Sequence, residues 1–163
     1  MTITDISTDR DALRLSVTSE LDASVGRAWM LVADPRLLER WWGPPSHPAT
    51  VVDHDLTPGG RVSYFMTGPE GEKYHGWWEV VAVDAPQRLE VRDGFADDAG
   101  APNPDMPVTR MVISLTPTGN GRAVMVMHSQ FASLDAMQKL LEMGMDEGIR
   151  QAAGQMDAIL AEA

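Results

Sequence analysis

Three titratable side chains, His128, Asp93 and His75, are the candidates for acid–base chemistry in this sequence. Strand alternation puts His128 on the same face as Val124 and Val126. If that face points inward, an imidazole in an apolar pocket could exchange protons near neutral pH. The alternative is a core histidine that is hydrogen-bonded to a neighbouring backbone group.

Asp93 continues the apolar alternation of its strand, so we expect it to point inward at the strand's end. A buried carboxylate has a raised pKa unless it is paired with a cation. Asp93 with His128 or His75 would then form an acid–base pair within hydrogen-bond reach. The alternative is an anchor for the following loop, in which Asp93 binds backbone amides.

Metal and cofactor chemistry have no signature in the sequence. The histidines at positions 47, 54, 75 and 128 lack the spacing of a local ligand pair, so we expect no metal site. The chain contains no cysteine, which excludes disulfides, thiolate metal sites and a cysteine nucleophile. Phosphate-loop and dinucleotide motifs are also absent, and we expect no cofactor.

Composition narrows the class of partner. The 163 residues fit one domain with one core, and the formal net charge of −11 disfavours nucleic acid, whose binding needs neutralising Lys and Arg. No apolar run approaches the roughly 18 residues of a membrane span, and the N-terminus lacks the pattern of a signal peptide. We therefore expect a cytoplasmic protein without membrane insertion, whose partner is a small molecule or another protein.

Aromatic residues and methionines are the main evidence for a pocket. Together they suit a cavity that adapts to an apolar or aromatic ligand, and they suit an ordinary core equally well. The predicted ligand-binding residues are Trp41, Trp42, Tyr64, Met66, Trp78, Met111, Ile113, Met137, Met145 and Ile149. By alternation, Met125 and Met127 are expected to form an exposed stripe, which suggests a homodimer contact.

The elements that must position these residues follow from periodicity. Residues 1–11 are polar and expected to be flexible, and residues 12–163 are expected to form a single domain. A first strand is followed by two short helices, and then by alternating segments that bring the total to about seven antiparallel strands. The Gly-, Pro- and Asp-rich segment 94–107 is expected to be a long loop, of the kind that often forms a lid or binding loop. This order predicts an α+β fold with a curved sheet.

The segment from Ser133 to Ala163 predicts one long amphipathic helix that the sheet wraps around, with Ser133 as its N-cap. Its glycines are unexpected, because Gly144, Gly148 and Gly154 each cost about 1 kcal/mol in a helix interior. Gly148 lies within the apolar stripe. Either a strand or a large ring approaches closely there, or the glycine leaves ligand space beside the helix.

A set of motifs then carries a family resemblance. The motifs are Trp29, Asp34-Pro35, Leu38, Trp41-Trp42-Gly43-Pro44, Asp55, Pro58-Gly59-Gly60, Gly71, His75-Gly76, Pro86 and Arg88-Leu89. Over residues 13–160 the chain resembles the SRPBCC superfamily (START/Bet v 1-like), and within it the branch named after the activator of Hsp90 ATPase, AHSA1-like. The resemblance implies a helix-grip fold, in which a cavity between sheet and helix usually accommodates apolar or aromatic small molecules.

The resemblance leaves function open, because one fold hosts many functions. The first hypothesis is binding of an apolar or aromatic small molecule in the cavity. The second is a polyketide cyclase, aromatase or dehydratase that uses an acid–base pair there. The third is a protein-interaction module akin to the co-chaperone domain. Relatives often carry Gly-Trp in the terminal helix, whereas this chain has Gly148-Ile149. The ligand-space and close-packing alternatives at Gly148 therefore stay equally open.

Overall fold

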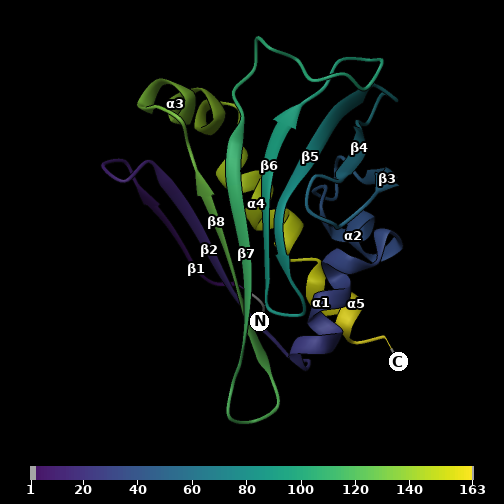
Figure 1. Ribbon diagram of the computed structural model, residues 1–163, viewed down its shortest axis with the longest axis vertical. Helices are drawn as coiled ribbons and strands as arrows, with labels where there is room; N and C mark the ends of the chain where they lie inside the picture. Colours follow the sequence, from purple (N-terminus) through teal and green to yellow (C-terminus); the bar gives the residue numbers. More distant parts are fainter. Residues whose placement is uncertain (1–2, 163) are drawn as a thin grey trace.

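The computed structural model describes residues 3–162, which form one antiparallel sheet, with two helices after its second strand and further helices at the C-terminal end (Figure 1). The strands lie in the order β1-β2-β8-β7-β6-β5-β4-β3. Their bounds are β1 (Ile3–Asp9), β2 (Arg14–Leu21), β3 (Ala49–His54), β4 (Arg61–Thr67), β5 (Lys73–Asp84), β6 (Arg88–Phe95), β7 (Thr109–Pro117) and β8 (Ala123–Gln130). The helices are α1 (Val25–Ala33), α2 (Pro35–Trp41), α3 (Leu134–Glu142), α4 (Met145–Ala153) and α5 (Met156–Leu160). The predicted α+β class is confirmed.

The strand beyond the expected seven is β1, at the edge of the sheet. We expected residues 1–11 to be flexible, but the chain from Ile3 to Asp9 pairs with β2 instead. Backbone hydrogen bonding to an open strand edge does not require an apolar pattern, and Ile6 adds packing against the core. Residues 1 and 2 lie outside the described part of the chain.

Local capping explains the two short helices after β2. The Ser24 side chain accepts a hydrogen bond from the amide of Arg27, and the Asp34 side chain accepts one from Arg36. These are standard N-cap contacts, and a proline in the first turn of α2 costs no hydrogen bond. The buried Trp41 indole donates from Nε1 to the Leu31 carbonyl at 2.8 Å. The helix pair therefore forms a fixed support for the tryptophans at the end of α2.

The C-terminal helical region is present, but the predicted single helix is divided into α3, α4 and α5. Gly144 has φ of 87°, a left-handed conformation that ends α3. Figure 1 shows α3 beside the end of β8, while α4 and α5 follow in a different direction along the sheet. Among the described residues, none of the helices is long and apolar enough to cross a membrane.

The inward face of β8 is the opposite of the one that we considered for His128. Met125 and Met127 are 0% and 3% exposed, and Ser129 is also buried, whereas His128 is partly exposed on the other face. The prediction of an exposed methionine stripe was therefore wrong. The homodimer contact that depended on this stripe loses its basis. The reason is that both faces of β8 carry apolar residues, so alternation alone does not select the inner one.

Candidate ligand pocket

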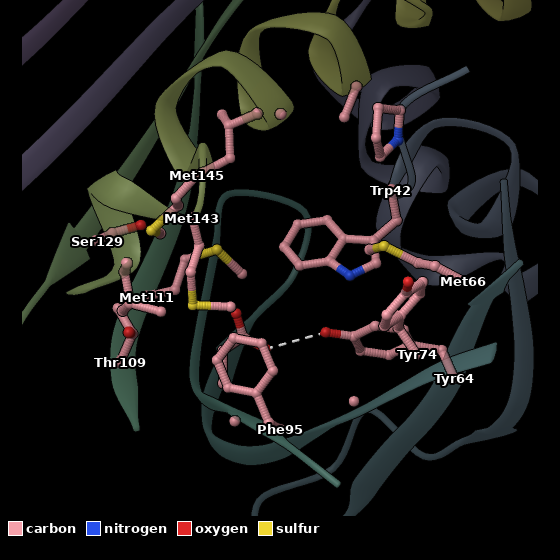
Figure 2. A pocket seen from close by; sticks show the side chains of 18 of the residues that line it. Trp42, Tyr64, Met66, Tyr74, Phe95, Thr109, Met111, Ser129, Met143 and Met145 are labelled. Atoms are coloured by element: carbon pink, nitrogen blue, oxygen red, sulfur yellow. Dashed lines mark hydrogen bonds between the residues drawn. The ribbon is translucent and has the colours of Figure 1, made fainter. Parts of the chain in front are cut away.

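A pocket of about 290 Å³ lies between the sheet, the end of α2 and the segment that joins α3 to α4. Its lining residues are Trp41, Trp42, Pro44, Tyr64, Met66, Tyr74, His75, Gly76, Asp93, Gly94, Phe95, Thr109, Met111, Met127, Ser129, Leu140, Met143, Gly144, Met145, Gly148, Ile149 and Ala152. Figure 2 shows two unlike sides: Trp42, Tyr64, Met66 and Tyr74 lie on one, and Met111, Met143, Met145, Thr109 and Ser129 lie on the other.

Most of the predicted ligand-binding residues line this pocket, namely Trp41, Trp42, Tyr64, Met66, Met111, Met145 and Ile149. Trp78, Ile113 and Met137 do not, and all three are fully buried in the core. Trp78 packs edge-to-face against Trp42 with ring centroids 4.9 Å apart. It therefore supports the pocket wall from behind.

Several lining residues were missed by sequence reasoning, including Met127, Ser129, Phe95, Thr109 and Met143. Met127 was assigned to the wrong face of β8, and Ser129 lies on the same inward face. Phe95 and Thr109 stand at the two ends of the long loop, whose residues 96–108 do not line the pocket. The loop is instead folded on itself, because the Asp97 carboxylate accepts two backbone hydrogen bonds within it. The sequence signal that could have found Phe95 and Thr109 is their position next to this loop.

Asp93 and Tyr64 form the polar centre of the pocket. The Tyr64 hydroxyl donates to Asp93 Oδ1 at 3.2 Å, shown by the dashed line in Figure 2. Burial raises the pKa of Asp93 to about 7, and the hydrogen bond from Tyr64 offsets part of that effect. Burial and the nearby Asp93 charge both raise the pKa of Tyr64. The pair can therefore hold or release one proton near neutral pH.

The two candidate histidines do not pair with Asp93. His128 lies on the outer face, where its Nδ1 is 2.7 Å from Ser16 Oγ, and burial together with the charge of Arg14 lowers its pKa. His75 is among the lining residues, but its ring lies beside that of Phe65, with the two ring centroids 5.7 Å apart. The structure thus contradicts the proposed Asp93–His128 pair. It does not show the loop-anchor alternative either, since within residues 3–162 the Asp93 carboxylate makes no hydrogen bond to a loop amide.

Two glycines shape the pocket. Gly76 lies opposite Tyr64 in the β4–β5 ladder, and a β-carbon there would come within 2.4 Å of Tyr64 Cζ. The phenol ring therefore lies across the glycine backbone. At Gly148 an added β-carbon would meet no atom within 4 Å, although the residue lines the pocket. This geometry agrees with the ligand-space alternative and not with close packing.

The pocket lining contains few charged side chains. Among the described residues that line the pocket, none is Lys or Arg, and Asp93 is the one carboxylate. Trp42 Nε1 is buried and makes no hydrogen bond within the described chain, although Figure 2 shows it on the side of the ring that faces Tyr64. Thr109 and Ser129, which carry hydroxyl groups, also line the pocket, on the wall opposite Trp42 and Tyr64.

A curved antiparallel sheet, a helix pair after its second strand and C-terminal helices along one face define the helix-grip class of the SRPBCC superfamily. The family model described as activator of Hsp90 ATPase homolog 1-like protein matches residues 22–161. The chain therefore belongs to the AHSA1-like family.

Solved structures support the same assignment. Protein Ms6760 from Mycobacterium smegmatis is 51% identical, with a TM-score of 0.90 over 99% of this chain and 98% of that one. A protein from Arthrobacter aurescens is 47% identical, with a TM-score of 0.94 over 99% of this chain and 94% of that one. The AHSA1 protein from Silicibacter pomeroyi shares the fold at 22% identity, with a TM-score of 0.71 over 91% and 97% of the two chains. No curated protein sequence matches the chain.

Proposed function

We propose that this protein binds an apolar or aromatic small molecule in the pocket between the sheet and α4. The observation that carries the proposal is a cavity of about 290 Å³ beside Gly148, lined by aromatic rings and methionines. That volume is just below the roughly 300–1,000 Å³ typical of ligand pockets. It suits a compact molecule of one or two fused rings.

The rim of the pocket supports access from solvent. Tyr74 and Met143 line the cavity and are also 55% and 56% exposed, so both stand where the pocket meets the surface. Large apolar side chains exposed at a cavity mouth are common at binding sites. Methionines at such a mouth can rearrange around ligands of different shape.

The test uses a variant that fills the cavity. Gly148→Leu should occupy the open space and abolish quenching of tryptophan fluorescence by added naphthalene. Gly26→Leu is the matched control, because Gly26 also lies in a helix, has no atom within 4 Å of an added β-carbon and does not line the pocket. Native mass spectrometry of protein purified from its own host should show a bound small molecule. The proposal fails if nothing co-purifies and naphthalene binding is absent or unaffected by Gly148→Leu.

A second candidate function is catalysis of the cyclase, aromatase or dehydratase kind. The specific observation that favours it is the Tyr64–Asp93 contact inside the pocket, together with a pKa of about 7 for Asp93. A carboxylate with this pKa can remove and return a proton at neutral pH. The protein-interaction hypothesis depends on a filled interior, and the cavity argues against that premise.

Proton exchange provides a test of the catalytic candidate without knowledge of the substrate. With 2-tetralone in deuterated water, catalysis predicts deuterium at the carbon next to the carbonyl faster than in buffer. Asp93→Asn should remove the acceleration, whereas Asp98→Asn, which changes an exposed loop carboxylate, should retain it. Exchange no faster than in buffer would count against the enzyme.

A further inference from the structure

The polar groups of the pocket form one band across the sheet. In the strand register, Asp93 lies directly beside Thr109 on the neighbouring strand. The Tyr64 hydroxyl reaches Asp93 from the other side. The helix side of the cavity, at Met145, Gly148 and Ile149, offers no hydrogen-bonding side chain. A ligand with one polar end would therefore place that end on the sheet.

Asp93 retains hydrogen-bonding capacity after its contact with Tyr64. One carboxyl oxygen accepts from the phenol, and the other makes no hydrogen bond with residues 3–162. The hydroxyls of Thr109 and Ser129 have no hydrogen-bond partner in the same part of the chain, and both residues line the pocket. A carboxylate oxygen is a strong acceptor for an O–H group in a cavity from which water is largely excluded.

The Asp93 carboxylate disfavours anionic ligands. No Lys or Arg is among the described lining residues, so an anionic ligand would meet Asp93 without a compensating cation. Bringing a second carboxylate into an apolar site next to the first one costs free energy through desolvation and like-charge repulsion. Fatty acids and aromatic carboxylates are therefore poor matches for this pocket when Asp93 is ionised.

We propose that the ligand is an uncharged hydroxyaromatic molecule of the phenol or naphthol class, whose hydroxyl binds Asp93 in the band formed with Tyr64 and Thr109. This inference rests on the proposed binding function and specifies the chemistry of the ligand. The ring system lies between the aromatic wall and the methionine wall, and the hydroxyl points to the sheet. The open space at Gly148 accommodates the far end of the ring system.

The test compares three probes with the same skeleton on the wild-type protein at pH 8.5, above the pKa of about 7 for Asp93, so that its carboxylate is mostly ionised. The probes are naphthalene, 2-naphthol and 2-naphthoate. One hydrogen bond to a charged acceptor is worth about 1.5–3 kcal/mol, so 2-naphthol should bind at least about tenfold tighter than naphthalene. Naphthoate should bind more weakly than naphthalene. Equal affinity for all three, or tighter binding of naphthoate, overturns the inference and leaves the binding function standing. Failure of all three probes to bind overturns the inference, and together with the absence of a co-purified molecule it overturns the binding function as well.

A variant comparison tests the role of Asp93 itself. Asp93→Asn removes the charge with little change of shape, so it should raise naphthoate affinity about tenfold and reduce the preference for 2-naphthol over naphthalene. Asp98→Asn makes the same chemical change on the exposed loop and should alter neither quantity. If Asp93→Asn leaves the discrimination between the three probes unchanged, Asp93 does not recognise the hydroxyl. The wild-type comparison remains decisive if the Asp93 variant does not fold.

Discussion

Asp93 should make the protein less stable as the pH rises from acidic to neutral values. Its pKa is about 7 in the folded protein and 3.8 ordinarily, because burial disfavours the charged carboxylate. Between these two values the folded state holds a proton that the unfolded state has released. Since stability rises with pH only where the unfolded state binds more protons, the contribution of Asp93 falls across this window.

The magnitude follows from the two pKa values. Each tenfold change in proton affinity is worth about 1.4 kcal/mol, so the change from 3.8 to about 7 corresponds to about 4 kcal/mol. This cost is fully present above the folded pKa of about 7 and absent well below the ordinary pKa of 3.8. Charged groups that could alter it are few, because the described lining residues include no Lys or Arg, and Tyr64, Tyr74 and His75 are the other titratable ones.

Urea unfolding of wild type and Asp93→Asn at several pH values measures this effect. Because the amide cannot ionise, the variant should gain on the wild type by about 3 kcal/mol between pH 4.5 and pH 8.5, since part of the cost is already present at pH 4.5. Asp98→Asn, on the exposed loop, should follow the wild type throughout. A stability difference between Asp93→Asn and wild type that stays constant over this range would refute the raised pKa, and with it the account of a desolvated carboxylate in the pocket.

Other substitutions test the glycines and the outer histidine. Gly148→Ala should stabilise the protein by about 1 kcal/mol through helix propensity, measured by urea unfolding, since its β-carbon meets nothing within 4 Å. Gly144→Ala should instead destabilise it by about 1–2 kcal/mol, because φ is 87°. Gly76→Ala should lower the melting temperature and weaken naphthalene binding, because its β-carbon would displace the Tyr64 ring. His128→Gln should leave probe affinity unchanged in the fluorescence titration, since His128 lies outside the pocket; a loss of affinity would contradict its placement.

Most of the fold was predictable because its signals are local. Strand alternation located β2 to β8, and the capping side chain of Ser133 marked a helix start that the structure confirms. Ser24 and Asp34 cap α1 and α2 by equally local contacts. The exception is β1, whose polar residues show no strand pattern. Its pairing comes from the exposed backbone edge of β2, which lies elsewhere in the sequence. A strand of this kind is specified by its partner.

The candidate site was only partly predictable, because its central contact joins distant segments. Asp93 was identified as inward-pointing from alternation, but its partner Tyr64 lies 29 positions away. Only the register of β4, β5 and β6 brings the two together. The face of β8 shows the same limit: alternation separates His128 from Met127, but which one points inward depends on packing across the whole sheet.

The glycines of the C-terminal segment link the break in the helix to the pocket. Met143, Gly144, Met145 and Gly148 all line the cavity, so the end of α3, the left-handed residue and the start of α4 meet at one place. A continuous helix with alanine at 144 and 148 would gain about 1 kcal/mol at each position from propensity alone. Local violations of propensity in natural proteins concentrate at functional sites. Gly148 leaves open space where α4 faces the cavity, and Gly144 changes the direction of the chain at the rim. The helix-propensity cost of each glycine is therefore found at the position where it shapes the cavity.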